Sequence, residues 1–446
     1  MMSNVIEDDD SFTKPLGRRT VLYYGVGHML NDITAACWFT YLLLFLTEIG
    51  LSPRDAATVM LSGQIADGFT TIFAGELTGL DISKYGMVQD LFWLPFHFLL
   101  SLVVAFLVRS LLPLHRHYEL LATACLQRSS TSMVNCITLS STGRVVLTSC
   151  RNAFTMVANL TLYAIALIVF AVTKAETNAD IENQYRWIAY FSIFFGCCFV
   201  GIFLLGTKEP RSKVGVQGNS HARIAWAYWF KRALYYEVAL VYVLTRLVTN
   251  ISQAYLAFYV INDLRMAQSA KALVPAIIYI CSFIISMILQ EIVWTGQRLK
   301  AYYSAGGILW IFCGAAILLL PRSMSAFMYF ISIFIGIANA LMTVTGVSMQ
   351  SVLIGENLGG CAFVCGSLSF LDKISCGLAL YVLQSLQNAG SSPELQLTKS
   401  VHVYISVTRF GLGLIPPFCA LVGVAVTYTM KLHTPFSKPI MEPLLE

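Results

Sequence analysis

The chain alternates long apolar runs with short polar segments along almost its whole length. A helix needs about 20 predominantly apolar residues to cross a lipid bilayer. Eleven runs reach this length, at 21–48, 55–77, 88–112, 151–172, 185–206, 233–260, 272–293, 301–320, 325–348, 359–385 and 401–430. A twelfth candidate at 118–142 is marginal, because it carries Arg128 and a cluster of Ser and Thr residues.

The polar stretch around 207–232 divides these runs into two groups, five before it and six after it. Lys and Arg collect there and near the N-terminus, as they do in cytoplasmic segments of membrane proteins. If both segments are cytoplasmic, an even number of spans separates them, so we count 118–142 as a span. The predicted divisions are an N-terminal segment (1–20), an N-terminal six-helix half (21–206, with 88–142 atypical), a linker (207–232), a C-terminal six-helix half (233–430) and a tail (431–446).

The composition excludes most other classes of protein. Hydrophobic residues make up 57% of the 446 residues and charged residues only 12%, whereas roughly a quarter of a soluble protein is charged. The net charge of +5 comes without a basic run interleaved with aromatic residues, which argues against nucleic-acid binding. No metal-binding or nucleophile motif is present, so we predict no enzyme activity and no bound metal. The prediction is an all-α polytopic membrane protein with about 12 transmembrane helices and both termini in the cytoplasm.

Charged residues inside the spans are the candidates for function, because each is costly to place in a bilayer. In the first span His28 and Asp32 share one helix face, which either lines an interior site or faces the lipid headgroups. In the second span Asp67 and Thr71 lie on a stripe that otherwise consists of glycine. That stripe could hold a proton or a small cation, or it could serve helix packing alone.

The second half of the chain has two further sets of polar residues. Arg246, Asn250 and Gln253 share a face of the seventh span, which suits an anionic or zwitterionic ligand. The alternative is that Arg246 pairs with a buried aspartate. Asp372 and Lys373 are neighbours in the eleventh span, so their side chains point about 100° apart and each needs a partner elsewhere. Placing Lys373 opposite Asp67 would neutralise both charges.

Four segments resemble the major facilitator superfamily, and within it the glycoside-pentoside-hexuronide:cation symporter branch. The segments are Tyr23–Asp32 with Tyr41, Gly63–Gly68 through Gly75, Ser132–Leu139 followed by Arg144 and Arg151, and Phe370–Lys373. The first is most similar to the eukaryotic group that contains the lysosomal and melanosomal cysteine importer. The second resembles the cation motif of the branch, and the fourth resembles its eleventh-helix lysine motif. The resemblance implies a major facilitator fold and solute transport.

The chain also departs from the pattern of the branch. Thr71 stands where the cation motif has its second aspartate, so a proton site is favoured over a sodium site. Ser140 stands near a position where the branch has an acidic residue. The sequence from Thr78 to Ser132 looks unlike any member, which leaves open a splice variant or a reading-frame error that abolishes function.

These observations predict a secondary active transporter that works by alternating access. We assign Asp67, Thr71, Lys373 and Asp372 to coupling of H⁺ or Na⁺, and His28, Asp32, Arg246, Asn250 and Gln253 to substrate binding. No other cofactor is expected.

The partners are a small polar solute and the lipid bilayer, and we expect a monomer. Resemblance to the branch implies a sugar, and resemblance to the eukaryotic group implies an amino acid such as cysteine. A transport-inactive scaffold or receptor-like protein is the alternative. We rank the vacuolar or lysosomal membrane slightly above the plasma membrane.

Overall fold

The computed structural model describes residues 18–81, 141–173, 177–206, 226–290, 292, 295–354, 361–390 and 407–432. The predicted span at 88–112 and nearly all of the one at 118–142 lie outside these ranges, as does most of the atypical segment from Thr78 to Ser132. Every regular element within the described ranges is helical.

The elements follow the order of the predicted spans. The N-terminal half contributes α1 (Arg18–Gly27), α2 (Met29–Cys37), the π-helical turn η2 (Trp38–Leu42), α3 (Leu43–Glu48), α4 (Pro53–Asp81), α7 (Ser141–Val172) and α8 (Asn178–Gly206). The C-terminal half contributes α9 (Trp226–Phe230), α10 (Ala233–Phe258), the π-helical turn η3 (Tyr259–Asp263), α11 (Ala270–Gln290), α12 (Gly296–Leu319), the short helix η4 (Arg322–Met324), α13 (Phe327–Ile354), α14 (Cys361–Gly390) and α16 (Val407–Thr429).

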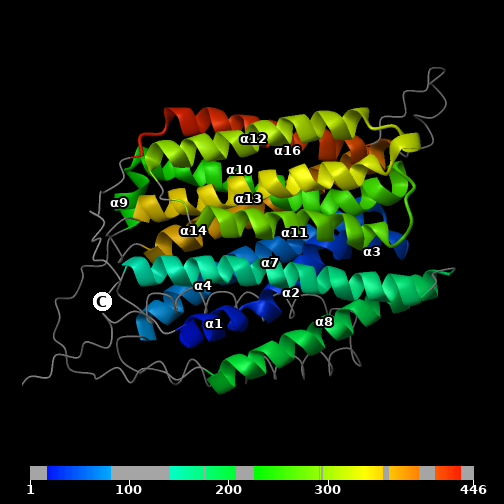
Figure 1. Cartoon of the computed structure of the whole chain (residues 1–446), viewed down its shortest axis with the longest axis horizontal. Helices are drawn as coiled ribbons and strands as arrows, with labels where there is room; N and C mark the ends of the chain where they lie inside the picture. Colours follow the sequence, from blue (N-terminus) through cyan, green and yellow to red (C-terminus); the bar gives the residue numbers. More distant parts are fainter. Residues whose placement is uncertain are drawn as a thin grey trace, which may run out of the picture.

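Eight helices within the described ranges are long and apolar enough to cross a membrane. The helices α4 and α10 fall outside this group, because charged and polar side chains interrupt their apolar runs. Both nevertheless run alongside the other helices through the bundle (Figure 1). The helices that carry Asp67 and Arg246 therefore have polar side chains within their apolar runs and still lie inside the bundle.

The first predicted span is interrupted at His28, where α1 ends and α2 begins. The His28 backbone N–H donates to the Gly25 carbonyl three residues earlier, at 3.2 Å, instead of continuing the α-helical pattern. A Cβ atom at Gly25 would lie 2.2 Å from the Phe154 ring on α7, and one at Gly27 would lie 2.8 Å from the Phe203 ring on α8. Glycine is therefore required at both positions for α1 to pack this closely against its own half.

The two halves lie side by side in the bundle (Figure 1). Within the described residues, α4 packs along α14 and α7 packs along α11, while η2 and α3 contact α10. A Cβ atom at Gly68 would lie 3.1 Å from the Phe370 ring, and one at Gly377 would lie 3.0 Å from both Leu61 and Gln64. These glycines bring α4 and α14 into close contact along the faces that carry Asp67 and Lys373.

One end of the bundle joins the two halves with apolar side chains. We call it the distal end; there α3 leads into α4, α7 into α8, η3 into α11 and α12 into α13 (at the right in Figure 1). Leu43, Leu44 and Leu46 of α3 and Met60 of α4 belong to the same buried apolar cluster as the C-terminal half. Conversely, Ala272 of α11 belongs to the cluster of the N-terminal half. Each half thus inserts side chains into the core of the other at this end.

Candidate functional site

An ion pair links the two halves near the middle of α4 and α14. The Lys373 Nζ atom lies 2.5 Å from Oδ2 of Asp67. The side chains are only 8% and 16% exposed, respectively. Lys373 therefore lies opposite Asp67, as expected from the sequence. Thr71, the other residue assigned to this stripe, lies on α4, but its side chain is outside the described residues.

A second ion pair lies within the C-terminal half, one residue away on α14. Arg246 Nε on α10 donates to Oδ2 of Asp372 at 3.0 Å. The Asn250 amide lies 3.4 Å from the other oxygen of Asp372 and 3.2 Å from the Cys376 sulfur, and the Cys376 thiol donates to Asp372 at 3.2 Å. The alternative that Arg246 pairs with a buried aspartate is therefore what the structure shows.

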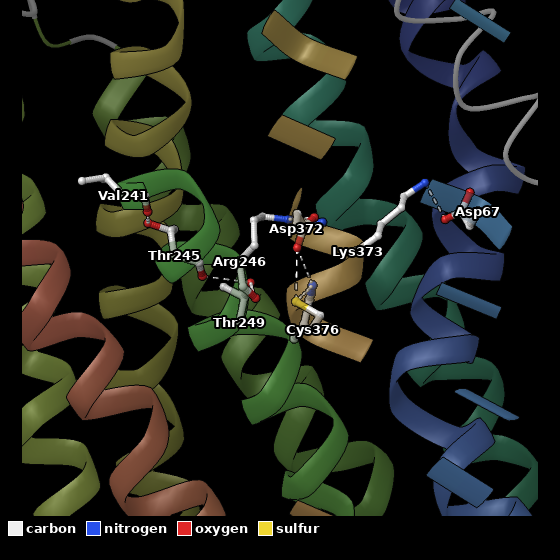
Figure 2. Close-up of polar contacts among 9 residues, drawn as sticks. Asp67, Val241, Thr245, Arg246, Thr249, Asp372, Lys373 and Cys376 are labelled. Carbon is white, nitrogen blue, oxygen red and sulfur yellow. Dashed lines mark hydrogen bonds and ion pairs between the residues drawn. The ribbon is translucent and has the colours of Figure 1, made fainter. Parts of the chain in front are cut away.

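The two pairs diverge from α14, with Arg246 and Asp67 on different sides of this helix (Figure 2). Asp372 reaches α10 in the same half, whereas Lys373 reaches α4 in the other half. This divergence follows from the turn of about 100° between neighbouring helical residues. One stretch of α14 therefore carries both a contact within its own half and a contact across the boundary between the halves.

A third polar group belongs to the N-terminal half. Thr155 on α7 donates to Oδ2 of Asp32 at 2.6 Å, and the Asn31 amide donates to Oδ1 at 3.2 Å. The charges of Arg151 and of Arg246 also act on the Asp32 carboxylate, the latter from the other half. Side chains of its own half therefore hold the Asp32 carboxylate, and Arg246 of the other half is within electrostatic range of it.

His28 is buried rather than directed toward lipid headgroups. Its side chain is only 1% exposed, and it lies within electrostatic range of Arg151. The Asp32 side chain is 9% exposed. The structure therefore supports the interior reading of this face of the first span, and His28 and Asp32 share the neighbourhood of Arg151.

Gln253 belongs to a separate, fully hydrogen-bonded cluster nearer the distal end. Its amide nitrogen donates to Thr40 Oγ1 at 2.8 Å and to the Tyr163 hydroxyl at 3.1 Å. Its amide oxygen accepts from the Tyr279 hydroxyl at 3.2 Å. Thr40 is part of η2, and π-helical turns frequently occur at functional sites. Gln253 thus bridges the two halves, but it is not in the same group as Arg246 and Asn250.

Several residues of the site were not predicted from the sequence. Thr155, Tyr163, Tyr279 and Cys376 are polar partners of the predicted residues. Only Cys376 had a signal in the sequence, because it follows Asp372 by four residues and so shares its helix face. Isolated Thr and Tyr residues in apolar helices give no comparable indication.

A helical bundle of two halves, with ionisable side chains paired at mid-depth and between the halves, is the architecture of a membrane transporter of the major facilitator type. Residues 23–434 match the family described as MFS/sugar transport protein. The chain belongs to this family. The finding agrees with the resemblance seen in the motifs of the first, second and eleventh spans.

Curated relatives cover nearly the whole chain. A human protein named "Major facilitator superfamily domain-containing protein 12" is 30% identical over 451 residues, which cover 91% of this chain and 93% of that protein. The mouse protein of the same name is 30% identical over 407 residues, covering 82% of this chain and 84% of that protein.

Solved structures of transporters share the fold at low sequence identity. A D-xylose-proton symporter gives a TM-score of 0.66 at 12% identity and covers 91% of this chain and 96% of its own. The nucleoside transporter NupG gives 0.61 at 11% identity, with 93% and 99% covered. The E. coli fucose:proton symporter gives 0.59 at 15% identity, with 93% and 97% covered. These matches show the major facilitator fold of this multi-pass membrane transporter.

Proposed function

We propose that this chain is a secondary active transporter, in which a proton or a small cation drives the movement of a small polar solute by alternating access. The observation that carries the proposal is the ion pair between Asp67 and Lys373, which joins the two halves near the middle of α4 and α14. Any rocking of one half against the other must strain or break this contact.

The energetics of the pair connect ion binding to movement. Separating a buried ion pair leaves two uncompensated charges, which is strongly unfavourable. A proton or cation on the Asp67 carboxylate replaces the charge of Lys373 and removes this penalty on one side of the pair. In the proposed cycle Asp67 therefore alternates between Lys373 and the coupling ion, and the halves separate there only when the ion is bound.

A proton fits this role better than sodium does. A bare cation site needs several oxygen ligands. Asp67 is the carboxylate that forms the ion pair with Lys373 among the described residues, and the position of the second acid in the related cation motif is Thr71. A single carboxylate is enough to carry a proton.

The solute site in this proposal lies between Arg246 and Asp32. Arg246 uses Nε for Asp372, and its side chain is 37% exposed although it stands in the middle of a long helix. Because its charge also acts on Asp32 in the other half, a solute bound there contacts both halves. Guanidinium, carboxylate and amide groups, the last from Asn250, bind either the hydroxyls of a sugar or the charged ends of an amino acid such as cysteine.

The orientation and location follow from the distribution of charge. We place both termini in the cytoplasm, because Lys and Arg collect in the N-terminal segment and in the linker. The distal end then faces the lumen of a vacuole or lysosome, or the outside of the cell. An acidic lumen would supply the proton gradient that the proposed coupling uses.

Uptake into liposomes tests the proposal. Purified protein is reconstituted, a pH gradient is imposed, and the accumulation of labelled cysteine and of labelled sugars is compared for the wild type and Asp67→Asn. Asp55→Asn is the matched control, since Asp55 is an exposed carboxylate on the same helix that pairs with Ser52. We expect gradient-driven uptake of one solute, lost in Asp67→Asn and retained in Asp55→Asn. Folded wild-type protein that accumulates none of these solutes would favour the transport-inactive scaffold instead.

A further inference from the structure

A second ion pair joins the two halves at the distal end, well apart in sequence from the pair between Asp67 and Lys373. Lys271 Nζ, at the start of α11, lies 2.7 Å from Oε1 of Glu48, the last residue of α3. The Tyr185 hydroxyl on α8 donates to the other oxygen of Glu48 at 2.9 Å. From the sequence, Glu48 and Lys271 would be taken for solvated charges at the ends of spans.

These three side chains are enclosed. The Lys271 side chain is 4% exposed and that of Glu48 is 20% exposed. The Lys271 ammonium lies 5.6 Å from the centre of the Phe170 ring and 5.8 Å from that of Tyr185, close enough for cation–π attraction. Phe45 packs against Tyr185 on another side, with ring centres 5.2 Å apart. Aromatic rings therefore shield this ion pair from water, which strengthens its attraction.

The contact crosses the boundary between the two halves. Glu48 and Tyr185 belong to the N-terminal half, and Lys271 belongs to the C-terminal half. The apolar side chains around the same end also interlock, since Ala272 packs in the N-terminal core and Leu46 in the C-terminal core. The halves cannot separate at this end unless both the ion pair and the apolar packing break.

We propose that Glu48, Tyr185 and Lys271 form a latch that holds the distal ends of the two halves together, and that exposure of the central site toward the distal side requires the latch to open. The inference rests on the proposed transport function, because it assumes that the halves move. The three side chains act as positioning residues: they set which face the transporter opens to and do not bind the solute. Tyr185 fixes the Glu48 carboxylate, and the carboxylate fixes the lysine.

The latch predicts how single substitutions shift the balance between conformations. Removing one partner leaves the other charge buried and unpaired while the distal end is closed, whereas in an open state water solvates it. Glu48→Gln and Lys271→Met therefore favour opening of the distal end. Tyr185→Phe removes one hydrogen bond to the carboxylate and has a smaller effect in the same direction.

Chemical accessibility of an engineered cysteine tests this inference. Ala56 on α4 is fully buried and belongs to the apolar cluster of the other half, so Ala56→Cys reports separation of the distal ends. Protein in nanodiscs is treated with a membrane-impermeant maleimide, and mass spectrometry reads the modification of each cysteine separately. Cys313, which is buried inside the C-terminal half, is the internal standard for unfolding.

The matched control is Glu182→Gln. Glu182 is an acidic residue near the same end of α8, but it is 43% exposed and pairs with Arg186 on its own helix. We expect Glu48→Gln and Lys271→Met to raise the labelling rate at position 56 at least about tenfold, which corresponds to about 1.4 kcal/mol. Tyr185→Phe should raise it less, and Glu182→Gln should leave it unchanged.

A double variant in which the two charges are exchanged tests the latch even if a single variant unfolds. The double variant Glu48→Lys with Lys271→Glu restores the attraction, and the inference requires its labelling at position 56 to return toward the wild-type rate. Unchanged labelling in folded Glu48→Gln and Lys271→Met, with Cys313 protected, would overturn the latch. The measurement uses neither solute nor gradient, so a failed latch is distinguishable from failed transport, which the uptake assay reports.

Discussion

Neutralising Asp67 should destabilise the fold and abolish coupling, and the two effects can be separated. At 2.5 Å and an effective dielectric constant of about 20, the attraction between Asp67 and Lys373 is about 7 kcal/mol. Desolvation of both groups offsets much of this value. Asp67→Asn nevertheless removes the carboxylate that pairs with the buried Lys373 ammonium, for which the expected loss of stability is about 3–5 kcal/mol.

The decisive comparison is a double-mutant cycle with Lys373→Met. Each single variant retains one buried charge and loses the opposite charge of this ion pair, whereas the double variant retains neither charge. We therefore expect the double variant to unfold at a higher temperature than either single variant, close to the wild type. Thermal unfolding of detergent-solubilised protein, followed by size-exclusion chromatography of the surviving fraction, measures this order.

Measuring solute uptake in the same variants separates the loss of ion coupling from the loss of stability. The double variant has recovered stability but lacks the carboxylate that exchanges the lysine for a proton, so it should remain unable to accumulate solute against a pH gradient. Two results would refute this reasoning. One is a double variant as unstable as the sum of its singles, and the other is gradient-driven uptake that persists without Asp67.

Three further outcomes are expected. Arg246→Lys keeps the positive charge but loses the Nε hydrogen bond to Asp372 and the planar donor pair, so solute affinity should fall about tenfold or more in a binding assay. Gly377→Val places a Cβ 3.0 Å from Gln64 on α4 and should cost about 1–3 kcal/mol of stability, whereas Gly201→Val, with no atom within 4 Å of its Cβ, should cost less. Thr71→Asp restores the second acid of the related cation motif, and uptake should become stimulated by sodium; sodium-independent uptake would contradict the assignment of this stripe.

The sequence predicted the fold because each span buries a long apolar run, and such runs are visible without any tertiary information. It also predicted the divergence of Asp372 and Lys373, since that depends only on helix geometry. The choice of Asp67 as partner for Lys373 followed from the need to neutralise buried charge. The apolar span predicted at 151–172 matches the candidate membrane span Ala153–Val172. Apolarity does not show that the helix containing this span begins earlier, at Ser141.

The remaining contacts depend on how helices distant in sequence come together. The bond between Gln253 and Thr40 joins residues 213 positions apart, and nothing local to either residue indicates the other. Glu48 and Lys271 lie at helix ends, where charged residues are normally solvated, so only the packing of α3, α8 and α11 shows that they are buried. Long-range pairing of this kind cannot be read from hydropathy or spacing.

The position of α14 explains how solute and ion could act on one another. Asp372 ties this helix to Arg246 within its own half, so this contact keeps its geometry when the halves move as rigid bodies. Lys373, the next residue, ties the same turn to Asp67 across the boundary, so its contact cannot be kept. A solute that draws Arg246 toward itself pulls on Asp372 and thereby on the backbone that aims Lys373. In the proposed cycle the two sites therefore communicate through one turn of one helix. A longer path of contacts between them is not required.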